Sequence, residues 1–238
     1  MLLFDGDILC YRVAYKTEEE SDSYAQYCAG SMLGDVLSRL AAQFGGDKDV
    51  TPYQVFLTGT TNFRTKVGVT APYKGNRVDK PKPVKIPVIR DYLVDQYGAI
   101  ISDNEEADDL ISIWATDYGD DACIVSIDKD FDQVQGWHYN FVKDNLYYVT
   151  EEEGIRFLYE QILTGDRVDN IIGLKGIGPV KAKKALAECT TEVEMFDKCV
   201  EMYGGNQDRV IENAQLCFLR RYPEQLWTPP TEEADETD

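Results

Sequence analysis

Acidic residues recur in this chain at the points where short apolar runs end. Asp5 and Asp7 follow the first such run, and Asp128 and Asp130 follow the mostly apolar residues 123–127. Ligands of parallel α/β sheets bind beyond the carboxyl ends of the strands, so acids at these places could hold a metal ion or a phosphoryl group. The alternatives are turn or cap residues for the first pair and an acidic surface loop for the second.

A second acidic group comprises Glu105, Glu106, Asp108 and Asp109, at the start of an expected helix. Acids in a first helical turn are stabilised by the helix dipole, which is one explanation for them. Four carboxylates within five residues also repel one another, and a nearby cation relieves that repulsion. The cluster therefore favours metal binding over capping alone.

A third acidic pair, Asp166 and Asp169, lies in Gly165-Asp166-Arg167-Val168-Asp169-Asn170. Residues three apart share one face of a helical turn, so the two carboxylates are expected to point the same way. A capped turn is the alternative.

Glycines and lysines follow in Gly173-Leu174-Lys175-Gly176-Ile177-Gly178, and then Pro179-Val180-Lys181-Ala182-Lys183-Lys184. Closely spaced glycines let backbone N–H groups approach a phosphate, and the next helix offers its N-terminus. The pattern is typical of a helix-hairpin-helix turn that binds the DNA backbone without reading sequence. A loop between packed helices is the alternative.

A basic stretch runs from Arg64 to Arg90, and it contains eight lysines and arginines but a single acid, Asp79. Within Pro72-Tyr73-Lys74-Gly75-Asn76-Arg77, the cations could grip a scissile phosphate and Tyr73 could stack on a base. A solvated basic loop is the alternative.

Composition excludes several classes of protein. The 238 residues carry a net charge of −19, which disfavours nucleic acid until the acids are seen to lie in clusters that a bound cation could neutralise. We expect a cytoplasmic protein (host cytoplasm if it is phage-encoded), with no membrane span, no signal peptide and no small-molecule organic cofactor. The one histidine, His138, and six scattered cysteines argue against zinc and against Ser-His or Cys-His catalysis.

Apolar runs alternate with helical patterns over the first 150 residues. Strands are expected at 2–5, 55–58, 100–101 and 123–127, and helices at 23–44, 89–97 and 104–118, which predicts a mostly parallel sheet covered on both faces. Residues 59–87 have little periodicity. Helices are expected at 155–163, 180–186, 193–202 and 209–220. We therefore divide the chain into an α/β core at 1–150, which includes the irregular region at about 59–90, a helical lobe at 151–227 and a disordered acidic tail at 228–238.

In this order the motifs resemble the flap endonuclease / 5′-3′ exonuclease family, which includes the 5′-nuclease domain of bacterial DNA polymerase I and stand-alone phage exonucleases. The resemblance covers about residues 1–190, and the compact size and the Tyr-Lys-Gly-Asn-Arg string favour the phage branch. It rests on Leu3-Phe4-Asp5-Gly6-Asp7, Tyr73-Lys74-Gly75-Asn76-Arg77, Glu106-Ala107-Asp108-Asp109, Ser126-Ile127-Asp128-Lys129-Asp130, and Gly165–Asn170 followed by Gly176-Ile177-Gly178.

The resemblance implies a PIN-like α/β fold with a mostly parallel sheet flanked by helices, and a helical lobe whose helix–three-turn–helix binds DNA. It implies two Mg²⁺ ions, for which Mn²⁺ can substitute, and a K⁺ ion in the helix–three-turn–helix. Asp5, Glu106 and Asp108 would hold the first Mg²⁺. Asp128, Asp130 and Asp169 would hold or orient the second, with Asp109 and Asp166 close by.

The same resemblance assigns the remaining roles. The catalytic residues would be Asp5, Lys74, Arg77, Glu106, Asp108 and Asp130. The DNA-binding residues would be Arg12, Arg64, Tyr73, Lys74, Arg77, Lys175, Gly176, Gly178, Lys181 and Lys183. The expected partner is a DNA duplex with a 5′ end or 5′ flap, or an RNA–DNA hybrid.

One position departs from the family. Many members carry an Asp after the second strand, where this chain has Thr58 and no acid nearby. Asp7, where many members have Ser or Thr, is hypothesised to compensate. The missing acid keeps open a structure-specific DNA-binding protein without turnover. A haloacid dehalogenase-type phosphatase also begins with a strand and D-x-D, but its second Asp is normally followed closely by Thr, and it has no use for the glycine hairpin.

Overall fold

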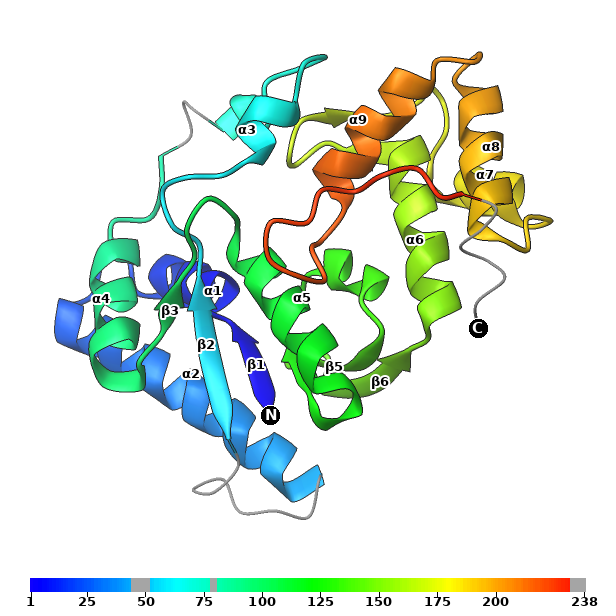
Figure 1. The fold of residues 1–238 in the computed structure, drawn as a ribbon. Helices are drawn as coiled ribbons and strands as arrows, with labels where there is room; N and C mark the ends of the chain where they lie inside the picture. Colours follow the sequence, from blue (N-terminus) through cyan, green and yellow to red (C-terminus); the bar gives the residue numbers. More distant parts are fainter. Residues whose placement is uncertain (44–51, 78–80, 232–238) are drawn as a thin grey trace. The chain divides into compact units, whose positions relative to one another are not determined.

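The computed structural model describes residues 1–43, 52–77 and 81–231. Packing divides the chain into two compact units. The first unit consists of Met1–Asn62, Pro81–Phe131 and Gly136–Tyr148, and the second of Phe63–Lys80, Asp132–Gln135 and Val149–Asp238. Figure 1 labels the elements, and each unit is described by itself.

The boundary between the units differs from the expected one. The sequence grouped residues 59–90 with the α/β core, whereas packing places Phe63–Lys80 with the helical unit. The reason is a set of hydrogen bonds and ion pairs, described below, that join residues 64–77 to helical-unit residues. The expected tail at 228–238 lies largely outside the described residues.

A six-stranded sheet forms the centre of the first unit, in the order β3-β2-β1-β4-β5-β6. The strands are β1 (Leu2–Asp5), β2 (Tyr53–Leu57), β3 (Ile100–Ile101), β4 (Cys123–Val125), β5 (Gly136–Asn140) and β6 (Asn145–Val149). The pairs β1–β2, β1–β4, β2–β3 and β4–β5 are parallel. This confirms the predicted α/β class with a mostly parallel sheet.

Helices cover both faces of this sheet, as the apolar strands require. On one face, Phe4 and Val55 join a core with α1 (Gly6–Lys16), α2 (Asp22–Gln43) and α4 (Ile86–Tyr97). On the other, Phe56 meets Trp114 of α5 (Ala107–Tyr118) edge-on, with ring centroids 5.2 Å apart. Figure 1 shows β1 and β2 side by side with α5 near them.

The strand order fixes where a ligand would bind. From β1 the chain moves outward to β2 and β3, and then returns to the other side of β1 to form β4. The order therefore reverses between β1 and β4. Such a switch point, at the carboxyl ends of the strands, is where ligands bind in open parallel sheets. Asp5 ends β1, and Ser126 follows the last residue of β4.

The second unit is mainly helical. It contains α3 (Arg64–Val67), a 3₁₀ turn at Gly75–Arg77, α6 (Glu151–Thr164), α7 (Pro179–Leu186), α8 (Glu192–Met202) and α9 (Gln207–Cys217). The short strands β7 (Gly165–Asp166) and β8 (Ile171–Ile172) pair antiparallel between α6 and α7. Its own core includes Tyr73, Tyr159 and Trp227.

Several local expectations need correction. Residues 136–140 and 145–149 form strands that were not predicted, although Trp137 and Tyr139, with His138 between them, make 136–140 a reasonable strand. Residues 165–172 form a small hairpin, not a helical turn. Gly165 ends α6 at a φ of +64°, and a Cβ there would lie 2.3 Å from the backbone nitrogen of Gly173, so only glycine allows this approach.

Candidate active site

Asp5 lies at the switch point and is held on both carboxylate oxygens. It caps α1, with Oδ1 accepting the N–H of Ile8 at 3.1 Å, while Oδ2 accepts the Ser126 hydroxyl at 2.7 Å. The residue is 3% exposed. Burial, with the nearby charge of Asp7, raises the pKa of Asp5 to about 7. A buried carboxyl under such repulsion is one that a cation would stabilise.

Ser126 links Asp5 to the other acids of the β4 loop. Its hydroxyl oxygen accepts the N–H of Asp128 at 3.0 Å, and Oδ1 of Asp128 accepts the N–H of Asp130 at 3.0 Å. The Asp128 charge also contributes to the raised pKa of Asp5. The structure thus brings these predicted site residues to one carboxyl edge of the sheet.

Asp7 is used differently from its neighbour. Its Oδ1 pairs with Arg90 of α4 at 2.6 Å, and its Oδ2 accepts the backbone N–H of Thr58 at 2.9 Å. Arg90 also donates to the Thr58 carbonyl at 2.6 Å. Asp7 and Arg90 therefore fasten the end of β2, where the family's acid is missing, to α1 and α4.

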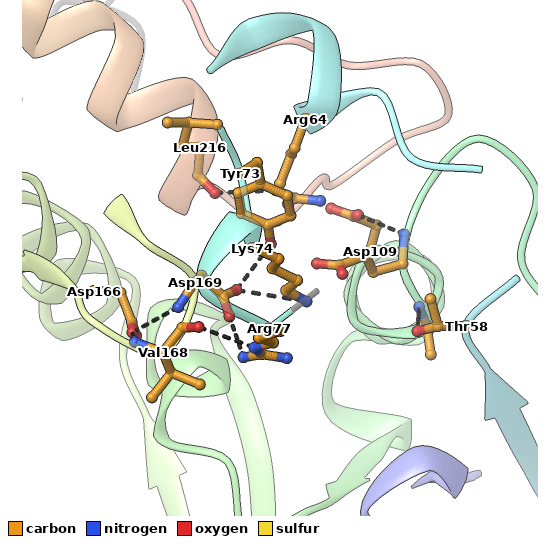
Figure 2. Close-up of polar contacts among 12 residues, drawn as sticks. Thr58, Arg64, Tyr73, Lys74, Arg77, Asp109, Asp166, Val168, Asp169 and Leu216 are labelled. Carbon is orange, nitrogen blue, oxygen red and sulfur yellow. Dashed lines mark hydrogen bonds and ion pairs between the residues drawn. The ribbon is translucent and has the colours of Figure 1, made fainter. Parts of the chain in front are cut away.

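The first turn of α5 lies at the same edge, because the Thr58 hydroxyl accepts the N–H of Ala107 at 2.9 Å. Asp109 is fully buried, and its Oδ2 accepts the N–H of Glu106 at 3.1 Å (Figure 2). Glu106 is 7% exposed and Asp108 is half-buried. Asp109 thus performs the capping role that was the alternative for this cluster.

We call Asp5, Glu106, Asp108, Asp128 and Asp130 the acidic edge. Its carboxylate oxygens are the hard donors that Mg²⁺ prefers. The raised pKa of Asp5 shows that, among the described residues, its carboxylate lacks a positively charged neighbour strong enough to offset burial and the nearby acids. The donor chemistry therefore fits a divalent ion. Within residues 1–43, 52–77 and 81–231, no three His, Cys, Asp or Glu side chains are already arranged as a metal-binding group.

In the second unit, Asp169 gathers three donors from one motif. The Tyr73 hydroxyl donates to Oδ2 at 2.8 Å, Lys74 Nζ lies 3.6 Å from Oδ2, and Arg77 pairs with Oδ1. Figure 2 shows these side chains converging on the Asp169 carboxylate. The sequence predicts separate roles for these two segments, phosphate binding for Lys74 and Arg77 and metal binding for Asp169. In the structure the two segments contact each other directly.

Backbone contacts reinforce this junction. The Lys74 N–H donates to the Asp169 carbonyl at 2.8 Å, and Arg77 Nε donates to the Val168 carbonyl at 2.9 Å. Asn76 donates to the Arg167 carbonyl at 2.7 Å. Asp166 Oδ1 accepts the N–H groups of Val168 and Asp169, at 2.5 and 3.2 Å, which makes the capped turn that was the alternative reading.

Burial corrects the expected roles of Arg64 and Tyr73 in DNA binding. Arg64 is 1% exposed and donates to the carbonyls of Leu216 and Phe218, at 3.0 and 2.7 Å. Tyr73 is 9% exposed, and its ring packs in the core of the helical unit. Arg64, which donates to backbone carbonyls, and Tyr73, whose ring packs in the core, are structural residues here.

The glycine-rich turn presents its lysines outward. Lys175, Lys181 and Lys183 are exposed, and Gly178 precedes the first turn of α7. Lys181 Nζ donates to the Gly176 carbonyl at 2.8 Å, and Gly176 has a φ of +80°. Arg12 is likewise exposed on α1, with its guanidinium 5.9 Å from the centre of the Phe141 ring.

Three residues around the acidic edge were not predicted to contribute. Arg90 and Thr58 hold Asp7, and Ser126 holds Asp5. The Ser126 position had a signal, because it opens the Ser126-Ile127-Asp128 string. Arg90 had none, since nothing in the sequence distinguishes it from the other cations of the basic stretch.

No family model matches the chain. It is 30% identical to DNA polymerase I of Streptococcus pneumoniae over 93% of this chain and 28% of the polymerase. It is 29% identical to Flap endonuclease Xni of Shewanella piezotolerans over 59% of this chain and 60% of that protein, and 34% identical to Xni of Shewanella sediminis over 59% and 60%. The chain thus spans about a quarter to three fifths of these relatives.

Solved structures from bacteriophage T5 share the fold. A T5 5′-exonuclease with bound zinc matches with a TM-score of 0.69 and 19% identity, over 91% of this chain and 88% of that one. A T5 flap endonuclease in a complex with DNA and metal ions matches with a TM-score of 0.68 and 18% identity, over 92% and 88%.

The mostly parallel sheet and its flanking helices form an α/β fold of the PIN-like kind, and the T5 structures share this fold. The relatives confirm the resemblance to the flap endonuclease / 5′-3′ exonuclease family. Within the described part of the chain, no helix is long and apolar enough to cross a membrane.

Proposed function

We propose that this chain is a structure-specific 5′-nuclease that hydrolyses DNA phosphodiesters with divalent metal ions. The observation that carries the proposal is the acidic edge at the switch point of the sheet, with Asp5 buried and bonded to Ser126. The proposal is supported by similarity to Flap endonuclease Xni and to the T5 structures.

Residues of the acidic edge would hold Mg²⁺, with Mn²⁺ as a substitute. Asp5, Glu106 and Asp108 are proposed for one ion, and Asp128 and Asp130 for a second. Bound ions of this kind activate a water and stabilise the leaving oxygen of a phosphodiester. Ser126 keeps the Asp5 carboxylate facing the edge through its 2.7 Å hydrogen bond.

Lys74 and Arg77 are proposed to bind the scissile phosphate. Arg77 is exposed and Lys74 half-exposed, so their charged ends can exchange Asp169 for a phosphate. Asp169, also a proposed metal ligand, orients the pair through its carboxylate. Exchange of one anion for another preserves the charge balance of both cations.

The duplex is proposed to bind at the glycine turn, where Lys175, Lys181 and Lys183 are exposed beside the start of α7. Backbone N–H groups and lysines there match the phosphate backbone without reading bases. A K⁺ ion held by backbone carbonyls of this turn belongs to the same proposal. So do a 5′ end or 5′ flap as the preferred substrate feature, and an RNA–DNA hybrid as an alternative one.

One observation favours a second candidate, a DNA-binding protein without turnover. Thr58 stands where the family has an acid, and both oxygens of Asp7 are engaged by Arg90 and Thr58. If the acids that remain cannot hold the ions for catalysis, binding would persist without cleavage.

A substrate panel tests the proposal. Wild-type protein should cut 5′-labelled flap and 5′-recessed duplexes in Mg²⁺, and EDTA should abolish cutting. Binding without cutting, even in Mn²⁺, would favour the second candidate. Hydrolysis of p-nitrophenyl phosphate without nuclease activity would instead indicate the phosphatase considered from sequence.

A further inference from the structure

A buried glutamate on α9 holds the segment that carries the two proposed phosphate-binding cations. We call residues 63–77 the basic strap. Glu212 of α9 is 7% exposed, and its Oε1 accepts the N–H groups of Val69 and Thr70, at 2.8 and 2.7 Å. Its Oε2 accepts the Thr70 hydroxyl and Arg209 Nη1, both at 2.6 Å. The carboxylate is therefore saturated by donors.

These contacts make Glu212 a clamp and not a surface charge. Burial of the carboxyl works to raise its pKa, but the hydrogen bonds from Thr70 and Val69 and the positive charge of Arg209 outweigh this and hold the pKa below its usual value. The carboxylate is thus charged at neutral pH. Hydrogen bonds to a charged acceptor are about twice as strong as neutral ones, so two successive backbone N–H groups are firmly fixed.

The clamp lies four residues before Lys74. Upstream, Arg64 ties the start of the basic strap to the carbonyls of Leu216 and Phe218 at the end of α9. Downstream, Lys74 and Arg77 meet Asp169. The strap is therefore attached to α9 at one end and to the β7–β8 hairpin at the other.

These two attachments respond differently to DNA. The hairpin attachment uses the charges of Lys74 and Arg77, and a phosphate that binds these cations would displace Asp169. The Glu212 attachment uses the backbone N–H groups of Val69 and Thr70 together with the Thr70 hydroxyl. Neither Lys74 nor Arg77 takes part in these hydrogen bonds. The Glu212 attachment can therefore persist when the cations move to a phosphate, and it limits how far they can move.

We propose that Glu212 is a positioning residue for DNA binding, which keeps Lys74 and Arg77 in place for the scissile phosphate by clamping the backbone of Val69 and Thr70. The inference rests on the proposed function and deepens it. Arg209 supports Glu212, and Glu212 itself touches no substrate.

The test compares Glu212→Gln with wild type and with an exposed control on α8, Glu201→Gln. The amide keeps the shape of the side chain but loses the charge and one accepting oxygen. Hydrogen–deuterium exchange should show faster exchange in the 68–77 segment of Glu212→Gln and no change in Glu201→Gln. Thr70→Val provides a milder variant from the strap side, in case Glu212→Gln fails to fold, and it removes one 2.6 Å hydrogen bond.

The decisive reading is the salt dependence of DNA binding, measured in Ca²⁺ to prevent cutting. Each phosphate contact contributes about 0.9 to the slope of log affinity against log salt, so loss of two placed cations should flatten the slope by up to about 1.8. Glu212→Gln should flatten it in this direction, and Thr70→Val should do so less. In a Lys74→Ala/Arg77→Ala background, Glu212→Gln should have no further effect on the slope.

A merely stabilising role predicts another result. It would lower the unfolding midpoint of Glu212→Gln but leave the salt slope of the folded variant at its wild-type value. That outcome, or an equal flattening by Glu201→Gln, would overturn the inference. Failure of the proposed function would look different, since wild-type protein itself would then neither bind nor cut the flap duplex.

Discussion

The Asp7–Arg90 pair gives the sharpest test of how this chain manages without the family's acid near Thr58. We predict that Asp7→Asn destabilises the first unit and has a smaller effect on metal binding. The asparagine Oδ1 can still accept the Thr58 N–H, so the variant mainly removes the charge opposite Arg90. The original hypothesis, that Asp7 compensates as a metal ligand, predicts the reverse.

The structure sets the size of the effect. The Asp7–Arg90 contact is 2.6 Å long, and each side chain is 25% exposed. A charge-assisted hydrogen bond contributes about 1.5–3 kcal/mol, and partial exposure reduces this through solvent screening. Arg90 keeps its bond to the Thr58 carbonyl in the variant. We therefore expect a loss of about 1–2 kcal/mol in the free energy of unfolding.

The assay is urea unfolding in EDTA of wild type, Asp7→Asn, Arg90→Gln and the double variant. The cycle should return a coupling of about 1–2 kcal/mol, and hydrogen exchange of the 53–58 segment should assign the loss to the first unit. Asp91→Asn, an exposed neighbour on α4, is the control for simple charge removal. Mn²⁺ affinity should fall by about tenfold, the low end of the 10–100-fold range for residues around the ligands, since Asp7 is not a ligand in this account. Zero coupling with a larger affinity loss would refute this reasoning and restore Asp7 as a ligand.

Two further predictions concern buried charges. Arg64→Lys keeps the charge but loses the forked guanidinium that donates to the carbonyls of Leu216 and Phe218. The second unit should therefore lose about 2–4 kcal/mol in the free energy of unfolding measured in urea, while the DNA affinity of the folded variant stays within about threefold of wild type. A large loss of DNA affinity without destabilisation would return Arg64 to the DNA-binding residues. The pKa of Asp5 is raised in the folded state to about 7 from 3.8, so ionisation of this carboxyl costs stability as pH rises between these values. In EDTA, Asp5→Asn should therefore be more stable than wild type at pH 8, by about 1–3 kcal/mol, with the gain fading towards pH 4; an equal difference at both pH values would show that the gain does not come from ionisation.

The sheet and the acidic edge were largely predictable from sequence. Apolar runs that end in acids, such as the one before Asp5, predict buried strands with carboxylates beyond their carboxyl ends. The order β3-β2-β1-β4 then brings Asp5 and the Ser126–Asp130 loop together. Pattern and topology were sufficient here because β1 and β4 are short, parallel and fully buried.

The environment of the basic motif was not predictable. The sequence predicts phosphate-binding roles for Lys74 and Arg77, but their contact with Asp169 spans more than 90 residues of sequence. Tyr73 and Arg64 have the residue types of DNA-binding side chains, yet tertiary packing buries both. Burial of an arginine depends on carbonyls that only the folded α9 presents, and no local pattern reports that.

The central claim is that the acidic edge cleaves DNA, and Asp130→Ala tests it most directly. Flap-duplex binding and cleavage would be measured side by side in Mg²⁺ and in EDTA, with Asp35→Ala, an exposed acid on α2, as the control. The account predicts that Asp130→Ala still binds the duplex and no longer cuts it, while Asp35→Ala behaves like wild type. Cutting by Asp130→Ala at the wild-type rate, or metal-independent cutting by wild type, would contradict it.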